Sequence, residues 1–283
     1  MLESNRTSNT AYQNLVTAHF DATTPEWEEV YTRQGVYATA YQLRMATVLS
    51  LLDNLSLPVD SRCLEIGCGP GLTTIALAER GYVVNAIDPV KAMVRRTQQR
   101  AIEARLGDRI FAGVGDVHNL SFPDSKFDLV LMIGVTEWLK DLRKPLQEVS
   151  RILKPGAYVI IACDNKWALH KLIDPLLNPA FAPLRRTLRN ALNSCGLLKN
   201  QLRNYCYSIR QFDALLFKVS LEKVEGVTLG FGPFSFFRLN FLSEAIGLWL
   251  QQRLQYLADG RFPLIRSGGV VYVAVAKKIL SGT

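Results

Sequence analysis

A glycine-rich turn in the middle of the chain has the composition of a ligand-binding loop. Residues 63–72 read CLEIGCGPGL, so an apolar stretch ends in Gly67, Gly69 and Gly71 and a helical pattern begins at once. Glycines let the backbone turn sharply and approach a ligand because no Cβ stands in the way. The predicted helix adds unpaired backbone N–H groups at its first turn. This spacing indicates a loop that holds a bound ligand.

Two well-known classes of glycine loop fit this spacing poorly. The P-loop of nucleotide hydrolases needs Lys followed by Ser or Thr after its last glycine, where this chain has Leu72 and Thr73. A dinucleotide-binding loop needs a third glycine three positions after its second, and Leu72 stands there. Glu65, two residues before the first glycine, is a further distinguishing feature. An NAD-linked oxidoreductase is therefore a disfavoured alternative.

Two acidic residues follow at the ends of the next two predicted strands. Asp88 lies close to the spacing expected of an acid that binds a ribose, because a carboxylate accepts two hydrogen bonds from a cis-diol. The compatible alternative is that it caps the helix beginning at Pro89. Asp116 suits an adenine amino group, although Asp also favours turns by itself. The glycine loop and both acids are expected at the carboxyl ends of parallel strands, where open α/β sheets bind ligands.

The segments that position these residues alternate between strand and helix patterns. This alternation predicts βαβ units and a parallel sheet. Strands are expected at 62–68, 82–88, 108–116, 127–134, 157–163, 224–232 and 269–278. Helices are expected at 73–80, 89–105, 141–154, 208–218 and 241–260, and residues 11–55 are mostly helical in pattern. The helix at 141–154 is expected to stop at Pro155-Gly156.

Five motifs in register resemble those of the class I S-adenosylmethionine (SAM)-dependent methyltransferases. They are E-x-G-C-G-x-G at 65–71, A-I-D-P at 86–89, G-D-V-H-N-L at 115–120, F-D-L-V at 127–130 and R-I-L-K-P-G at 151–156. The likeness covers residues 60–165, in order and at the family spacing. It implies a Rossmann-like α/β fold with a seven-stranded, mostly parallel sheet whose last strand is antiparallel. A helical cap from the N-terminus and from insertions completes the expected fold.

The resemblance also implies where SAM would bind. Gly67, Gly69 and the backbone of Cys68 would hold the methionine part, and Glu65 belongs to the same motif. Asp88 would hold the ribose. The residues implied around the adenine and along the pocket are Met93, Asp116, Val117 and Ile133.

Two further likenesses are more local. Glu137 stands where many relatives carry Glu-His, but Trp138 replaces the histidine and indicates an apolar wall. Residues 19–31, HFDATTPEWEEVY, resemble a segment before the core in methyltransferases of quinone and tetrapyrrole pathways. On that basis Tyr31 and Arg44, with Tyr37 and Tyr41 beside them, are candidates to close over the cofactor. Packing between helices is the alternative for all four.

Methyl transfer from a sulfonium depends mainly on alignment of donor and acceptor. A hydroxyl acceptor would also need a base, for which histidine is the usual residue near neutral pH. His170, at the start of the first insertion, and His19, before the N-terminal cap, are the candidates. His118 is expected to contact the cofactor or to pack, and Glu137 is expected to be structural.

The core is expected to be divided by two insertions. The predicted segments are an N-terminal helical cap (1–55), a SAM-binding core (56–165), a helical insertion (166–207), a core helix and strand (208–232), a second insertion (233–264) and the last strand (265–283). The first insertion carries Arg185, Arg186 and Arg189, and the second carries GFGPFSFF at 230–237. Either these residues form the core of a cap, or they line a pocket for a lipophilic acceptor, with peripheral contact to an anionic membrane.

Composition limits the other classes of function. The chain has 283 residues and a net charge of +8, but no nucleic-acid motif accompanies that charge, so a nucleic-acid partner is not expected. No apolar run is long enough to span a bilayer, and the polar N-terminus does not read as a secretory signal. The five cysteines have no metal-ligand spacing and predict neither a disulfide framework nor a metal site. A cytoplasmic protein, with its oligomeric state left open, is the expectation.

The sequence therefore predicts a SAM-dependent methyltransferase that acts on a small, lipophilic or aromatic acceptor and releases S-adenosylhomocysteine (SAH). Methylation of oxygen is favoured over nitrogen or carbon. A SAM-binding sensor or scaffold without catalytic activity is the alternative from another class.

Overall fold

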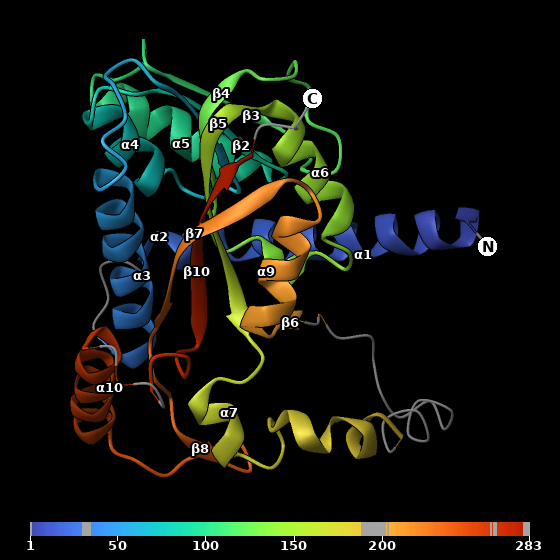
Figure 1. Cartoon of the computed structure of the whole chain (residues 1–283), viewed down its shortest axis with the longest axis vertical. Coiled ribbons are helices and arrows are strands. Elements are labelled where there is room, and N and C mark those ends of the chain that lie inside the picture. Colours follow the sequence, from blue (N-terminus) through green and yellow to red (C-terminus); the bar gives the residue numbers. More distant parts are fainter. Residues whose placement is uncertain are drawn as a thin grey trace.

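The chain folds into a three-layer α/β/α sandwich (Figure 1). The computed structural model describes residues 2–29, 35–187, 202, 204–260, 262 and 265–279. The central sheet has the order β3-β2-β1-β4-β5-β10-β7, and β6 adds a short pair at the end of β5. The strands are β1 (Arg62–Ile66), β2 (Val83–Asp88), β3 (Ile110–Val114), β4 (Phe127–Met132), β5 (Leu153–Asn165), β6 (Cys206–Tyr207), β7 (Leu221–Leu229) and β10 (Val271–Lys278).

The directions of the strands match the sequence-based expectation. The pairs from β3 through β5 are parallel, and β10 runs antiparallel to both β5 and β7. From β1 the sheet grows to β2 and β3 on one side and to β4 and β5 on the other. An open α/β sheet binds its ligand at such a change of direction. The prediction of a Rossmann-like sheet with an antiparallel last strand is confirmed.

Helices cover both faces of the sheet (Figure 1). Helices α3 (Val36–Asp53), α4 (Leu72–Glu79) and α5 (Lys91–Glu103) pack on one face, and α6 (Arg143–Ile152) and α9 (Ile209–Phe217) pack on the other. Side chains alternate along each strand, so Leu64 and Ile66 of β1 join the second cluster of helices and Cys63 joins the first. Each face of the sheet therefore has its own apolar core.

The predicted boundary between the helix at 141–154 and the strand at 157–163 was wrong. The helix expected at 141–154 ends at Ile152, and β5 begins at Leu153 and runs through Pro155 and Gly156. The reason is tertiary: Leu153 is fully buried and pairs with Phe127, and the Lys154 ammonium contacts Asp128 at 2.6 Å.

Helices precede the sheet and the insertions extend beyond the carboxyl ends of its parallel strands. Helices α1 (Leu2–Ala22) and α2 (Thr24–Glu29) come first, and α1 projects from the body toward the N-terminus (Figure 1). The first insertion holds α7 (Leu169–Ile173), η2 (Pro179–Phe181) and a helical stretch at 182–187. Residues 188–201 and 203 of this insertion, and with them Arg189, lie outside the described residues.

The second insertion combines a hairpin with a helix. Strands β8 (Ser235–Phe236) and β9 (Leu239–Asn240) pair in an antiparallel hairpin, and α10 (Glu244–Asp259) follows. Phe231 and Phe234 are buried in a small satellite core with Ala258 of α10. Phe236 and Phe237 are exposed, so the four phenylalanines of 230–237 divide between a cap core and the surface.

The described residues include no membrane-spanning helix, no disulfide and no group that could bind a metal ion. No helix in the described part of the chain combines the length and the apolar character needed to cross a membrane. The four described cysteines are free thiols, and none of the described His, Cys, Asp and Glu side chains form a group that could hold a metal ion.

Candidate active site

A cavity of about 980 Å³ opens at the carboxyl ends of β1, β2 and β4. One end is lined by the glycine loop and by the turns that follow β2, β3 and β4. Residues of α1, α7 and the β8–β9 hairpin form further parts of its wall. The cavity therefore joins the predicted cofactor end of the sheet to the cap.

The glycine loop has a backbone that side chains cannot easily follow. Gly67 has φ +74°, and a Cβ there would stand 2.3 Å from Cγ2 of Val135 in the turn after β4. Gly69 also has a positive φ, of +51°, but it has open space within 4 Å of the same position. The loop is thus packed tightly against Val135 at Gly67 and open toward the cavity at Gly69.

Glu65 lies beneath the loop on β1. Its carboxylate accepts a short hydrogen bond from the hydroxyl of Thr74 in α4, and the residue is buried. Burial, with a smaller contribution from the charge of Asp88, raises the pKa of Glu65 to about 8, and the Thr74 hydrogen bond opposes this rise. A cationic group entering the cavity would favour the ionised carboxylate.

Asp88 places both carboxylate oxygens at the end of β2. Oδ2 accepts a hydrogen bond from the backbone N–H of Gly69 at 3.0 Å, and Oδ1 accepts one from Val90 at 2.8 Å. Burial raises the pKa of Asp88, and these two bonds oppose the rise. Each carboxylate oxygen can accept a second hydrogen bond, so the turn-capping interpretation and the ribose interpretation are compatible in this geometry.

The turn after β3 forms the next part of the wall. Asp116 accepts a hydrogen bond from the backbone N–H of His118 at 2.9 Å and contacts the imidazole Nδ1 at 2.7 Å, and the imidazole contact is the largest cause of its lowered pKa. Val117, Met93 and Ile133 also line the cavity. Asp116 therefore caps its turn, and its proposed contact with adenine stays a prediction.

The N-terminal segment contributes aromatic rings and one cation. The Arg44 guanidinium stacks over the ring of Tyr41 at 4.8 Å, and Trp27 meets that ring edge-on at 5.5 Å. Arg44, Tyr41 and Trp27 all line the cavity. Tyr31 lies outside the described residues, and Tyr37 is placed only as part of α3.

Glu137 and Asp164 bring two carboxyl groups to the cap side of the cavity. Glu137 follows β4 and Asp164 is near the end of β5. Burial and the charge of Asp164 raise the pKa of Glu137, and Arg44 partly offsets this. Burial also raises the pKa of Asp164, although Lys171 and Arg44 oppose the rise. At least one proton is therefore retained by this pair at a higher pH than usual.

The two histidine candidates occupy different places. His170 of α7 lines the cavity, is buried, and has an Nδ1 atom without a hydrogen-bond partner among the described residues. Burial and the neighbouring Lys171 lower the pKa of His170 to about 4, so its imidazole is neutral at physiological pH. His19 is not among the residues that line the cavity, and its ring lies 6.3 Å from that of Trp138.

Several lining residues were missed by sequence reasoning. Asp164 ends a parallel strand as Asp88 does, and that position was a usable signal. Gln13 donates a hydrogen bond to the carbonyl of Trp138 at 3.1 Å across 125 residues of sequence, and Ser235 and Arg238 arrive on the hairpin. Contacts of this kind depend on the tertiary fold, so no local pattern predicts them.

The chain is similar in sequence to known methyltransferases. Residues 64–161 match the family described as "Methyltransferase domain". The malonyl-[acyl-carrier protein] O-methyltransferase of Halorhodospira halophila is 32% identical over 165 residues, 56% of this chain and 51% of that protein. The tRNA 5-carboxymethoxyuridine methyltransferase of Escherichia coli K12 is 32% identical over 147 residues, 50% of this chain and 56% of that protein.

These matches cover part of each protein, and the chain spans about half the length of these two curated relatives. A solved structure extends the likeness in fold to nearly the whole chain. Magnesium protoporphyrin IX methyltransferase from Synechocystis PCC 6803, with bound SAH, has a TM-score of 0.62 at 16% identity and covers 94% of this chain and 99% of its own.

Proposed function

We propose that this chain is a SAM-dependent methyltransferase that transfers a methyl group to a small, lipophilic acceptor and releases SAH, because residues 64–161 match a methyltransferase domain and the fold resembles that of a methyltransferase with bound SAH. The observation that carries the proposal is that one cavity is lined both by the glycine loop and by residues of the cap. Such a cavity can hold donor and acceptor next to each other.

The residues at the loop end fit SAM. Gly69 leaves open space where a side chain would stand, Asp88 keeps acceptor capacity for a ribose diol, and Glu65 offers a carboxyl group to a cationic methionine end. When bound, SAM would supply an electrophilic methyl group. Gly67, Cys68 and the turn at Asp116–Val117 would fix its orientation through shape and hydrogen bonds.

The chemistry at the cap end suits an acceptor that loses a proton. Glu137 and Asp164 share a raised affinity for protons, and His170 stays neutral with an orphaned ring nitrogen. We infer that Glu137 or His170 accepts a proton or a hydrogen bond from a hydroxyl acceptor, which favours methylation of oxygen. His19, away from the cavity lining, is the weaker candidate for this role.

Apolar side chains indicate the acceptor class. Leu177, Leu229, Val270, Val271 and Trp138 line the cavity beside polar groups that include Asp164, His170 and Arg238. Apolar walls with few polar groups are typical of sites for small organic ligands. We therefore propose a lipophilic or aromatic small molecule as the acceptor, with no nucleic-acid partner.

Two measurements, made one after the other, test the proposal. Titration calorimetry should detect binding of SAH but not of NAD, and binding of NAD alone would replace the proposal with an oxidoreductase. Incubation with methyl-labelled SAM and fractionated lipophilic extracts should then transfer label to an extractable product. Tight binding of SAH without transfer to any fraction would favour a SAM sensor or scaffold.

A further inference from the structure

The β8–β9 hairpin has a turn that its residues do not favour. Phe237 and Arg238 join the two strands and have φ values of +50° and +62°. Two-residue hairpin turns with positive φ at both positions are normally built from Asn and Gly. For side chains as large as Phe and Arg this conformation is strained, and strain persists only where the surroundings enforce it.

Asp174, a residue of the first insertion, holds the hairpin turn in this conformation. Its carboxylate Oδ2 accepts hydrogen bonds from the hydroxyl of Ser235 at 2.6 Å and from the backbone N–H of Arg238 at 2.7 Å. Oδ1 accepts a bond from Leu176 at 2.8 Å, and Asp174 is buried. The hairpin is therefore held in one shape by a side chain from α7 and its following turn.

The shape displays apolar side chains to solvent. Phe236 and Phe237 meet edge-to-face at 4.8 Å and are 50% and 53% exposed, and Leu239 and Phe241 are 74% and 55% exposed. The first insertion adds Leu172, Leu176 and Leu184, which are 41%, 38% and 70% exposed. A braced and strained hairpin that exposes four apolar side chains in six residues indicates an interaction surface.

The same end of the molecule is basic. Residues 166–187 and 230–243 contain Lys166, Lys171, Arg185, Arg186 and Arg238, and the one acid in these stretches is Asp174. Asp174 is already used within the fold. The guanidinium of Arg185 donates to the carbonyls of Pro175 and Asn178, so no carboxylate is used in those contacts.

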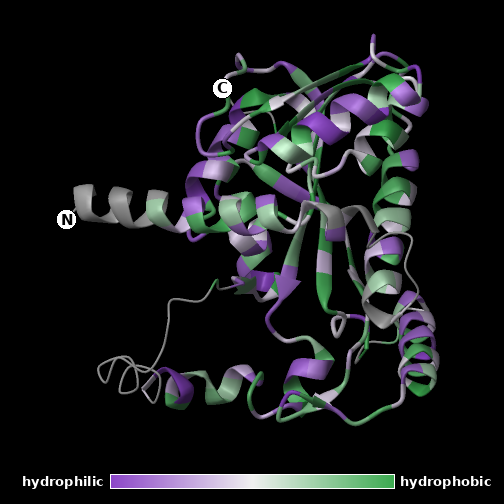
Figure 2. Ribbon diagram, turned by 180° about the vertical axis from the view of Figure 1, so that it is seen from behind, coloured by the Kyte–Doolittle hydropathy of each residue, from purple (hydrophilic) through white to green (hydrophobic). Residues whose placement is uncertain are grey.

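The hairpin also borders the cavity. Figure 1 places α7, the helical stretch at 182–187 and β8 together at the end of the molecule beyond the carboxyl ends of the parallel strands. Figure 2 shows the same elements together from behind, with apolar and polar segments mixed along them. Ser235, Arg238 and Leu177 of this region line the cavity that holds the cofactor residues.

We propose that the β8–β9 hairpin and the adjoining first insertion dock on an anionic membrane surface, with Phe236, Phe237, Leu239 and Phe241 entering the headgroup boundary. Aromatic side chains favour that boundary, and cations are attracted to acidic headgroups. A protruding hairpin suits a soft lipid surface, whereas a folded acidic protein would need a matching pocket. The docked cavity would receive a lipophilic acceptor from the bilayer, and this last consequence rests on the proposed function.

Vesicle sedimentation of the full chain tests the docking. Binding should occur to vesicles of phosphatidylcholine with phosphatidylserine and should weaken with added salt. The double variant Phe236→Ser, Phe237→Ser should lose at least about tenfold in partitioning, because it removes two apolar side chains from the interface. Phe111→Ser is the matched control, since Phe111 is 53% exposed on β3 and should leave binding unchanged.

The contribution of the basic residues to membrane binding is tested separately. Arg186→Gln should weaken binding to phosphatidylserine vesicles, while Arg210→Gln on α9 should not. Failure of the wild-type chain to bind vesicles, or equal binding by the hairpin variant, would overturn the proposal, as would binding to an acidic soluble protein in place of vesicles. SAH calorimetry on each variant reports folding and cofactor binding, so failed docking and a failed methyltransferase assignment give different results.

Discussion

At the scale of single residues, Glu65 couples cofactor binding to pH. In the ligand-free protein burial holds the pKa of Glu65 near 8, so the carboxyl is largely protonated at neutral pH. If it pairs with the ammonium of the methionine part, binding must lower that pKa and release a proton. Affinity for SAH should therefore rise as pH increases toward 8.

Calorimetry in two buffers of different ionisation enthalpy measures that proton. Glu65→Gln should weaken SAH binding by about tenfold, the loss of roughly one charged hydrogen bond. The variant should also lose the dependence on pH. Glu79→Gln, at the exposed end of α4, is the control, and an unchanged pH dependence in Glu65→Gln would remove Glu65 from the site.

Glu137 predicts a stability effect that needs no ligand. Its pKa is raised by burial and by Asp164, so the folded state binds more protons than the unfolded state between the ordinary pKa of Glu and the raised value. Stability should therefore fall as pH rises through that window. Glu137→Gln should be more stable than wild type above the window by about 1–3 kcal/mol, with a smaller difference at low pH. Urea unfolding at both pH values measures this, and Glu222→Gln on the exposed side of β7 should show no such trend.

At the scale of elements, the glycine loop depends on its contact with the turn after β4. Gly67→Ala must place a Cβ where Val135 now stands, at a positive φ that disfavours Ala. We expect a loss of stability of about 2 kcal/mol or more and a loss of SAH binding. Gly113→Ala on β3 is matched, because a Cβ there meets nothing within 4 Å. Thermal unfolding with and without SAH distinguishes the two variants.

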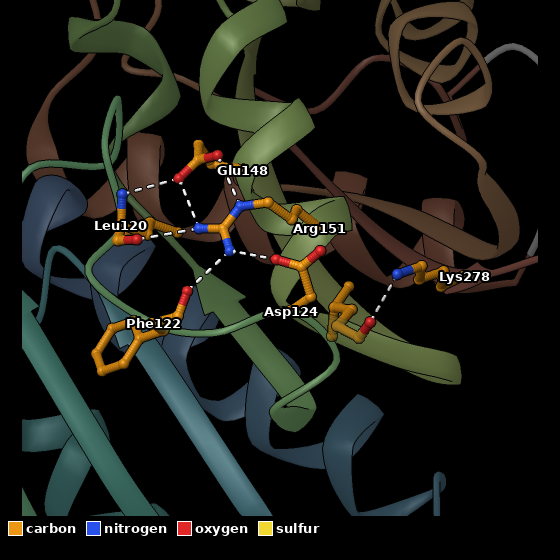
Figure 3. Close-up of polar contacts among 7 residues, drawn as sticks. Leu120, Phe122, Asp124, Glu148, Arg151 and Lys278 are labelled. Atoms are coloured by element: carbon orange, nitrogen blue, oxygen red, sulfur yellow. Dashed lines mark hydrogen bonds and ion pairs between the residues drawn. The ribbon is translucent and has the colours of Figure 1, made fainter.

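Arg151 anchors the loop between β3 and β4 to α6 (Figure 3). Its guanidinium donates to both oxygens of Glu148, to Asp124, and to the carbonyls of Leu120 and Phe122 at 2.7 to 3.0 Å. Glu148 in turn accepts a hydrogen bond from the N–H of Leu120 at 2.9 Å. This loop directly follows the turn at Asp116. Arg151 therefore helps to position that turn, which is expected to contact the adenine.

A lysine cannot reproduce that planar set of donors. Arg151→Lys should lower stability by about 1–2 kcal/mol, because several charge-assisted bonds to a partly exposed group are lost. Hydrogen exchange at 116–124 should speed up more than elsewhere. Arg143→Lys, on the same helix with a side chain 78% exposed, should change little, and equal effects in both variants would contradict the anchoring role.

At the scale of the whole molecule, the local chemistry of the sequence predicted the core and the presence of a cap, but not the contacts that hold the cap in place. Alternating apolar strands and the glycine spacing at 67–71 specify the sheet, because each βαβ unit is formed by neighbours in sequence. The bond from Gln13 to Trp138 and the bonds from the hairpin to Asp174 join distant segments. The hairpin itself lacks the Asn-Gly signal of its turn, so Phe237 and Arg238 gave no indication of it.

The contact between α1 and Trp138, which are far apart in the sequence, predicts how a bound ligand leaves the cavity. Phe20 meets the ring of Trp138 edge-on at 5.1 Å, and Gln13 binds the carbonyl of the same residue. Both residues of α1 line the cavity, so α1 forms part of the wall of the predicted cofactor and acceptor site. A bound ligand should have to displace α1 before it leaves.

Phe20→Ala should therefore speed SAH dissociation by up to about tenfold, because an edge-to-face pair contributes about 0.5–1.5 kcal/mol. Stopped-flow fluorescence can follow release, since Trp27 and Trp138 line the cavity while Trp167 and Trp249 are exposed elsewhere. Leu15→Ala is the control, because Leu15 is an exposed residue of the same helix. Equal rates for Phe20→Ala and Leu15→Ala would mean that SAH leaves by a route that α1 does not cover.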